Sequence, residues 1–205
     1  MSTRLTTTDI LFRQRMLQCQ GLYKGNLDGL WGPKTDAAQQ AFERLSAGIA
    51  TAYGSFDAAS ERHIATLLLR AQAMARQCLT AIRSVAIDAR IIAGTRSYAE
   101  QDALYKQGRY GNPGPRVTNA RGGQSNHNFA IAWDIGIFEQ GHYRGDSPLY
   151  DQAADVAVNS GITGLEWGGT WKSIVDKPHY QLATGLTVTE MRQRFEKGEA
   201  ILPPL

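Results

Sequence analysis

The sequence predicts an α+β protein, in which a small N-terminal helical bundle precedes a domain whose mainly antiparallel sheet is flanked by helices. Two observations carry this prediction. Apolar residues in the first third recur at helical spacing between short glycine-rich turns, and strand-like apolar runs begin only after Val85. We place the boundary near residue 65, so that the helical domain covers 1–65 and the larger domain covers 66–205.

The helices of the first third are bounded by capping and turn residues. Thr8 or Asp9 is suited to cap the first helix, and Pro33 sits at a favourable first position of the second. Gly48 and Gly54 are expected to interrupt the chain after the second helix. The expected helices cover 9–20, 33–45 and, as one long helix or two abutting ones, 56–84.

After Val85, strand candidates alternate with short helices. The glycine- and proline-rich stretch 109–123 predicts an irregular loop. Thr187 and Glu190 have the spacing of a capping box, and Gly198 marks the expected end of the last helix. The strand candidates are 86–94, 129–138 and 179–183, and the helices between them are 97–107 and 148–159.

The composition is typical of a soluble globular protein. Of the 205 residues, 42% are hydrophobic and 20% are charged, which is enough apolar material for a core. The net charge of +3 would favour adsorption to an acidic polymer but is too small to indicate nucleic acid binding. Cys19 and Cys78 lie far apart and outside any CxxC motif, so we expect reduced, semi-buried thiols.

Two of the four histidines have a carboxylate at an informative distance. His127 precedes Asp134 by seven residues, and Asp176 precedes His179 by three. Asp134 interrupts the apolar run 131–135, where an unpaired buried carboxylate would cost several kcal/mol. It therefore needs a partner. The remaining histidines, His63 and His142, are interpreted as surface residues.

Two imidazoles and one carboxylate, with a fourth position open for water, would make a catalytic zinc site. In this interpretation one Zn²⁺ per chain lies on His127, Asp134 and His179, with Asp176 close enough to accept a proton from the water. The same spacing allows another interpretation. Asp134 could pair with an arginine such as Arg96, and His179 could be a hydrogen-bonded core histidine.

The stretch VTNARGGQSNHNFAIAWDIGIF resembles the S-x-H-x-x-G-x-A-x-D signature of a family of zinc peptidases. The family includes VanY-like D-Ala-D-Ala carboxypeptidases and L-alanyl-D-glutamate endopeptidases. The matching residues are Ser125, His127, Ala132 and Asp134. Ala130 stands where the family usually has glycine, and we expect a strand position to tolerate the added methyl group.

Two further segments resemble the family in the same order, so that the likeness covers roughly residues 85–183. GTRSYAEQDALYKQGR, at 94–109, is similar to the family's G-x-R-s-x-x-e-Q-x-x-L-y-x-q-G-r element. EWGGTWKSIVDKPHYQL is similar to its W-G-G-x-W…D-x-P-H-x-Q segment. The residues that match in the second segment are Trp167, Gly168, Gly169, Trp171, Asp176, Pro178, His179 and Gln181.

The resemblance implies a role for each matching residue. His127, Asp134 and His179 would hold zinc, and Asp176 would act first as general base and then as general acid. Arg96, the other expected catalytic residue, would bind a substrate carboxylate or stabilise the oxyanion. Glu166 is a weaker candidate for the base. The expected substrate-binding residues are Ser125, Gln101, Trp167 and Trp171.

The N-terminal third resembles a small peptidoglycan-binding domain marked by a D-G-x-x-G-x-x-T turn. LYKGNLDGLWGPKTDAAQQAFERL matches it through Asp28, Gly29, Gly32 and Thr35. The expected wall-binding residues are Asp28, Gly29, Trp31 and Thr35. The alternative is a helical cap that only stabilises the enzyme.

Together the resemblances imply a peptidoglycan hydrolase of the phage endolysin type that cleaves the stem peptide, most readily at the L-Ala-D-Glu bond. The alternatives are a D-Ala-D-Ala carboxypeptidase, a non-catalytic wall-binding protein, and a protein that zinc only stabilises. Residues 1–20 lack the apolar core of a signal peptide, and no run could span a bilayer. We therefore expect a monomer made in the host cytoplasm, released to act on bacterial peptidoglycan, without nucleic acid binding or membrane insertion.

Overall fold

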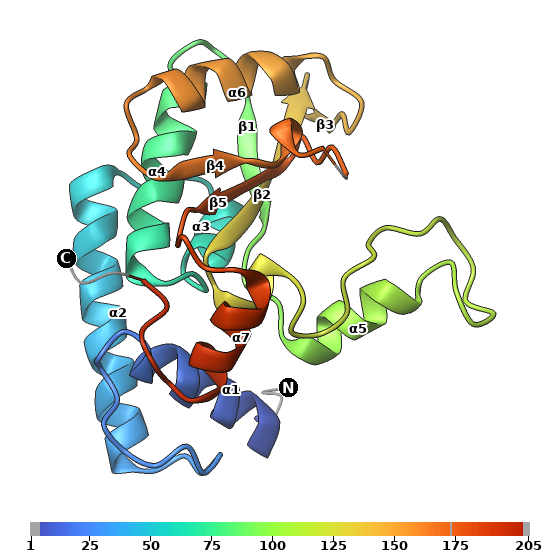
Figure 1. The fold of residues 1–205 in the computed structure, drawn as a ribbon. Helices are drawn as coiled ribbons and strands as arrows, with labels where there is room; N and C mark the ends of the chain where they lie inside the picture. The colour runs from blue at the N-terminus through green and yellow to red at the C-terminus, as the bar shows by residue number, and fades with distance from the viewer. Residues whose placement is uncertain (1–4, 173, 203–205) are drawn as a thin grey trace. The chain divides into compact units, whose positions relative to one another are not determined.

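The computed structural model describes residues 5–172 and 174–202, which form two compact units (Figure 1). The unit that we call the helical unit comprises Met1–Leu45, Arg96–Phe129 and Thr184–Leu205. The sheet unit comprises Ser46–Thr95 and Ala130–Ala183. Each unit is built from separate parts of the chain, and the division of the chain at residue 65 stays a prediction.

The sheet unit confirms the predicted α+β class with an antiparallel sheet. Its strands run in the order β1-β2-β5-β4, and the short β3 pairs with β2 (Figure 1). All the pairings are antiparallel. The strands are β1 (Ala89–Ala93), β2 (Ala132–Glu139), β3 (His142–Tyr143), β4 (Leu165–Trp167) and β5 (His179–Leu182). The three predicted strands are present, and the sequence did not predict β3 and β4.

One face of this sheet forms an apolar core with the helices of the unit. Successive strand residues point to opposite faces, which places Trp133 and Ile135 of β2 with Tyr180 of β5 on the core face. All three are fully buried, and the rings of Trp133 and Tyr180 stack with centroids 6.4 Å apart. The hydroxyl of Tyr150 on α6 approaches the backbone of β2. The helices of this unit are α3 (Ala58–Ile64), α4 (Leu69–Arg83) and α6 (Leu149–Asn159).

The helical unit is held together by a cluster of aromatic rings. The ring of Phe195 lies 5.3 Å from that of Phe12 and 5.7 Å from that of Phe129. These residues come from three segments that are far apart in the sequence, so the cluster joins both ends of the chain to its middle. The elements of this unit are α1 (Thr7–Gln18), the first part of α2 (Pro33–Tyr53), α5 (Tyr98–Lys106), the 3₁₀ helix η1 (Asn126–Phe129) and α7 (Val188–Glu196).

Three local predictions are corrected. The cap of α1 is Thr6, whose hydroxyl accepts from the N–H of Asp9 while the Asp9 carboxylate closes a capping box. Helix α2 continues through Gly48 to Tyr53 and stops before Gly54, whose φ is +88°. The segment 56–84 forms two separate helices. Among the described residues, no helix is both long and apolar enough to cross a membrane.

Candidate metal centre and active site

The register of β2 against β5 explains how the apolar strand accommodates a carboxylate. Asp134 lies directly opposite His179, and the Asp134 Oδ1 atom is 3.2 Å from the His179 Nδ1 atom. Both side chains lie on the face of the sheet opposite the core, because they alternate with Trp133 and Tyr180. The Asp134 carboxylate therefore has a polar partner, the imidazole of His179, while Asp134 remains part of β2.

His127 completes a group of three possible metal ligands. It lies on η1, is 2% exposed, and its backbone carbonyl accepts a hydrogen bond from the N–H of Arg96 at 3.0 Å. One ligand atom each of His127, Asp134 and His179 lies within 4.8 Å of the others. Two imidazoles and a carboxylate at this spacing suit a three-ligand metal site, with zinc as the typical occupant.

Asn128, which the sequence analysis did not single out, ties the segment before η1 to the segment before α5. Its side chain is fully buried and donates to the carbonyls of Arg96 and Ser97, at 2.9 and 3.3 Å. The side-chain oxygen accepts from the N–H groups of Gly123 and Ser125, at 2.9 and 3.3 Å. Its place at the end of the polar run 124–128, directly before the apolar residues 129–133, is the signal that could have indicated this role.

The expectation for Ala130 is wrong. This residue precedes β2 and has a φ of +57°, in the left-handed region that favours glycine. Ala130 is fully buried, and its carbonyl accepts from the N–H of Leu68 at 2.8 Å. The glycine of the family signature therefore corresponds to a turn conformation, and the alanine here carries backbone strain of about 1–2 kcal/mol.

The candidate base, Asp176, lies on the turn that leads into β5. Its N–H donates to the carbonyl of Gly168 at 3.1 Å, and its own carbonyl accepts from the N–H of His179 at 3.2 Å. A Cβ atom on Gly168 would lie 2.6 Å from the carbonyl oxygen of Asp176 and 3.0 Å from the Cβ of His179. Only glycine fits this close approach, which holds Asp176 beside a metal ligand.

Two tryptophans surround this turn. The ring of Trp171 lies 4.8 Å from the imidazole of His179. Trp167 donates from its indole N–H to the carbonyl of Lys177 at 2.8 Å, and its ring covers Gly169, where a Cβ atom would collide with it. Both side chains are partly exposed, as expected for the wall of a substrate site.

The second ring nitrogen of His179 forms a hydrogen bond with Gln181, on the side of the ring away from Asp134. Its Nε2 atom lies 2.9 Å from Oε1 of Gln181, whose amide nitrogen donates to Glu166 at 2.6 Å. Burial favours the neutral imidazole, but the hydrogen bond and charge of Asp134 outweigh it and raise the pKa of His179. Glu166 is thus engaged with Gln181, whereas Asp176 lies on the backbone turn that contacts His179.

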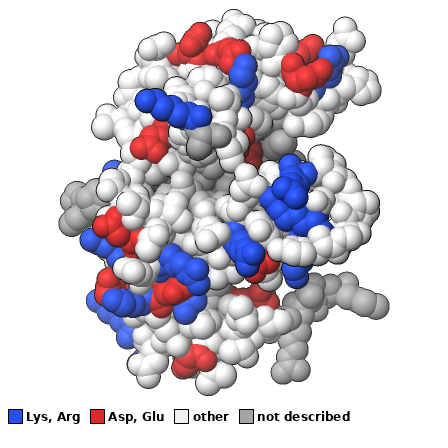
Figure 2. All heavy atoms as spheres, turned by 45° about the vertical axis from the view of Figure 1, so that its right-hand side comes forward, with Lys and Arg blue, Asp and Glu red and all other residues white. Residues whose placement is uncertain are grey.

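Arg96 and Gln101 lie in the helical unit, just before a stretch of the chain that carries several basic residues and no acidic ones. Gln101 is buried and donates to the carbonyl of Ala120 at 3.0 Å, and its side-chain oxygen lies 3.5 Å from the Arg96 guanidinium. Residues 103–133 contain no Asp or Glu, and Figure 2 shows a group of basic side chains on the face that carries α5. The basic residues of this stretch are Lys106, Arg109, Arg116 and Arg121.

Most of the N-terminal turn motif contacts a single buried side chain, Gln14. Its amide nitrogen lies 2.8 Å from Oδ1 of Asp28 and 3.3 Å from Oγ1 of Thr35, and its oxygen accepts from the N–H of Gly29 at 2.9 Å. Gly29 has a φ of +69°, and a Cβ atom there would lie 2.5 Å from Thr7. Of the four expected wall-binding residues, Trp31 is the one whose large side chain is exposed, at 40%.

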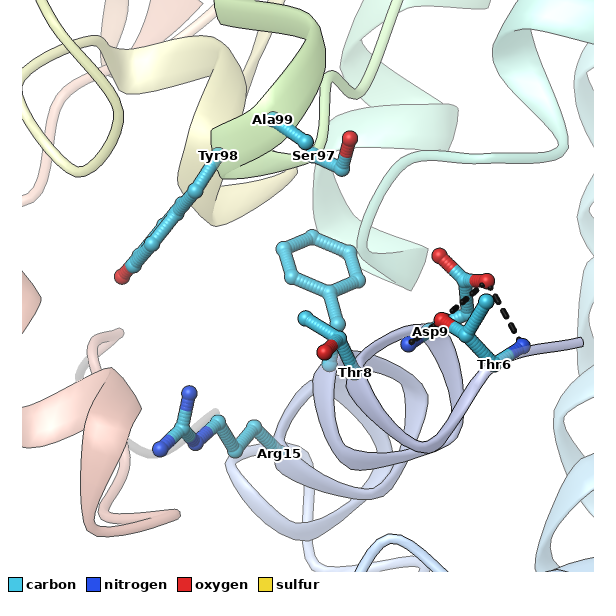
Figure 3. A pocket seen from close by; sticks show the side chains of 8 residues that line it. Thr6, Thr8, Asp9, Arg15, Ser97, Tyr98 and Ala99 are labelled. Atoms are coloured by element: carbon cyan, nitrogen blue, oxygen red, sulfur yellow. Dashed lines mark hydrogen bonds between the residues drawn. The ribbon is translucent and has the colours of Figure 1, made fainter. Parts of the chain in front are cut away.

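The helical unit also contains a pocket of about 420 Å³ beside the start of α1 (Figure 3). Its wall includes Arg15, the first turn of α5, and Thr6 and Asp9, which are hydrogen-bonded to each other at the start of α1 (Figure 3). None of the three candidate metal ligands lines it. The pocket is therefore separate from the chemistry of the metal group.

Comparisons with known proteins agree with the metal group. Residues 118–182 match the M15 peptidase family model described as D-alanyl-D-alanine carboxypeptidase. The chain is 39% identical over 103 residues to the peptidoglycan L-alanyl-D-glutamate endopeptidase CwlK of Bacillus subtilis (strain 168). This alignment covers 47% of this chain and 61% of that relative.

A solved structure shares the fold. The L-Ala D-Glu endopeptidase ChiX of Serratia marcescens superposes with a TM-score of 0.51 and 24% sequence identity, covering 63% of this chain and 90% of that one. All three candidate ligands fall within residues 118–182. Residues 118–182, which match the family model described as D-alanyl-D-alanine carboxypeptidase, thus carry the His-Asp-His group of possible metal ligands.

Proposed function

We propose that this chain is a zinc-dependent peptidoglycan hydrolase that cleaves the stem peptide at the L-Ala-D-Glu bond. The observation that carries the proposal is the His127-Asp134-His179 group within the matched peptidase segment. The choice of bond is supported by the likeness to CwlK, an enzyme named for that cleavage. The four basic residues of the stretch 103–133, which contains no Asp or Glu, suit a peptide that contains acidic residues such as D-glutamate.

Zinc bound at this group would polarise a water molecule and the scissile carbonyl. The carboxylate of Asp176 accepts the proton of the attacking water and returns it to the leaving amine. Its position depends on the backbone turn from Gly168 to His179. Arg96, whose guanidinium is a fixed planar donor, binds a carboxylate of the substrate or the developing oxyanion.

The test is digestion of purified sacculi, with the released muropeptides analysed by mass spectrometry. New N-terminal D-Glu is expected, and Asp176→Asn should keep the metal while turnover falls on the order of 10²–10⁴-fold. Asp155→Asn, at an exposed position of α6, is the matched control. New reducing sugar ends would refute the peptidase assignment. An inactive Glu166→Gln that still binds zinc, together with an active Asp176→Asn, would reverse the choice of base.

The second candidate function is D-Ala-D-Ala carboxypeptidase, which the description of the matched family model favours. The same digestion distinguishes the two reactions, because a carboxypeptidase releases free D-Ala and leaves no new N-terminal D-Glu.

We also propose that the N-terminal residues contact the wall through the exposed Leu30 and Trp31, which are 66% and 40% exposed. Asp28, Gly29 and Thr35 support this turn through Gln14. The test is sedimentation of the Asp176→Asn protein with sacculi. Leu30→Ser with Trp31→Ala should weaken binding, whereas Leu45→Ser, at another exposed leucine of the helical unit, should not. Unchanged binding would favour the helical-cap alternative.

Release from the host cytoplasm as a phage endolysin, and action as a monomer, remain proposals that rest on the sequence analysis. Lysis of cells that produce the protein only when a holin is co-expressed would support the endolysin role. Lysis that does not depend on a holin would contradict it. Light scattering coupled to gel filtration tests the monomer.

A further inference from the structure

The register of the sheet places a second polar pair beside the metal ligands. Glu166 on β4 lies directly opposite Gln181 on β5, as Asp134 on β2 lies opposite His179. Because side chains two residues apart on a strand share a face, Gln181 and His179 project on the same side. On the other side of β5, Gln181 faces Ala132, whose methyl group leaves room for the longer amide.

The hydrogen bonds of this pair determine which way the Gln181 amide points. An ionised carboxylate only accepts hydrogen bonds, so the end of Gln181 that lies 2.6 Å from Glu166 must be its NH₂ group. Its oxygen then faces His179, 2.9 Å from Nε2. An amide oxygen only accepts as well, so Nε2 must carry a hydrogen. Gln181 and His179 are 9% and 4% exposed, which limits competition from water.

The consequence falls on the other ring nitrogen. When the ring is neutral and its hydrogen lies on Nε2, the lone pair is on Nδ1, which faces Asp134 at 3.2 Å and could bind a metal together with that carboxylate. Without Gln181, the carboxylate of Asp134 would favour a hydrogen on Nδ1, and that hydrogen would block a metal.

We propose that Glu166 and Gln181 are positioning residues, which hold His179 in the tautomer that can bind a metal through Nδ1. Metal-bound histidines commonly donate their free N–H to a carboxylate or carbonyl. Here the carboxylate of Glu166 orients the amide of Gln181, and that amide accepts the N–H of the His179 ring. This inference rests on the proposed metal site, and it gives Glu166 a role other than that of a base.

The first test is zinc affinity, measured by competition with a chromophoric chelator and without substrate. Gln181→Leu should weaken zinc binding about 10–100-fold, because the partner of Nε2–H is lost. Gln181→Glu alone should weaken it similarly, because two carboxylates would then face each other. The control Gln152→Leu, at an exposed position of α6, should bind zinc like the wild type.

The decisive variant exchanges the two groups, Glu166→Gln with Gln181→Glu. The new carboxylate at position 181 can accept from both His179 Nε2–H and the new amide at 166, so zinc affinity should return to within about 3-fold of wild type. This rescue keeps the test meaningful if a single variant folds poorly. A double variant no better than Gln181→Glu alone would overturn the proposal, as would wild-type affinity in Gln181→Leu.

A spectroscopic measurement separates positioning from general stability. In the zinc-loaded wild type and in the double variant, ¹⁵N-resolved NMR should show a hydrogen on His179 Nε2 that exchanges slowly with solvent. In Gln181→Leu that hydrogen should exchange fast, and an unchanged rate would contradict the proposal. Zinc binding without hydrolysis of sacculi would refute the proposed function while leaving the positioning pair supported. A wild type that binds no zinc would refute both.

Discussion

The buried amide of Gln14 organises the N-terminal turn, and Gln14→Leu tests how much it contributes. Gln14 is fully buried, and leucine has a similar size, so the change removes hydrogen bonds while leaving little empty space. The amide nitrogen approaches several acceptors but has only two hydrogens, and its two shortest contacts are to Asp28 and to the carbonyl of Leu30, at 2.8 and 3.0 Å. The amide oxygen accepts from Gly29 at 2.9 Å.

The expected loss of stability follows from the two bonds to backbone groups. Each contributes about 1 kcal/mol, and the N–H of Gly29 would also stay buried without a partner, which brings the loss to about 3 kcal/mol. The Asp28 carboxylate is exposed and can be hydrated, so we leave it out of this sum. A change of this size should speed hydrogen exchange of the Gly29 amide about 10²-fold if the turn opens locally.

The assay is urea unfolding followed by circular dichroism, together with amide exchange at Gly29. Gln40→Leu is the control, because Gln40 is exposed on α2 and bonds to Asp36 on the same helix. It should change the free energy of unfolding by no more than about 0.5 kcal/mol. A Gln14→Leu protein within about 1 kcal/mol of wild type, with Gly29 still protected, would refute the reasoning.

Three further predictions concern the metal, the pH dependence of stability and the thiols. Replacing either histidine of the metal group with alanine should abolish the binding of about one zinc per chain, as metal analysis would show; full occupancy in both variants would refute the site. The hydrogen bond from Arg76 lowers the pKa of Glu61, so its contribution to stability is present above its unfolded pKa of about 4.3 and is lost as the pH falls through the lower folded value. The free energy of unfolding should therefore fall less steeply below about pH 5 in Glu61→Gln than in wild type, and equal slopes would contradict this. Burial raises the pKa of Cys19 to about 12 and that of Cys78 further, so neither thiol should react with a thiol reagent at about pH 8 until the protein unfolds.

The sequence was more informative about the candidate metal ligands than about the residues that hydrogen-bond to them. His127, Asp134 and His179 were singled out by their spacing together with the resemblance to a family of zinc peptidases, and the structure brings these three residues together. Gln181 was recognised only as part of a motif, because its contact with Glu166 depends on the pairing of β5 with β4. With three residues, β4 is too short for an alternating pattern to be recognised.

Backbone conformation was the other feature that the sequence did not reveal. The methyl group of Ala130 gives no sign of a positive φ, and the apolar residues that follow it made the position resemble part of a strand. Helix α2 continues through Gly48, although the intrinsic preference of glycine disfavours it, and near this glycine the Ser46 hydroxyl donates to the buried Gln72 of α4 at 2.7 Å. Tertiary contacts decide such cases, and a single sequence does not contain them.

Because Asp134 and His179 lie directly opposite each other on paired strands, the distance between these two candidate ligands does not depend on the segment that connects the strands. Their separation is set by backbone hydrogen bonds between β2 and β5, whereas residues 140–178 leave and return at the ends of these strands. That segment contains β3, α6 and the tryptophan-lined turn, so insertions or exchanges around α6 could reshape the approach to the site while both ligands stay in place. Variation among related enzymes, and the grafting of new substrate preferences, should therefore concentrate around α6 and spare the paired strands and the turn that carries Gly168 and Asp176.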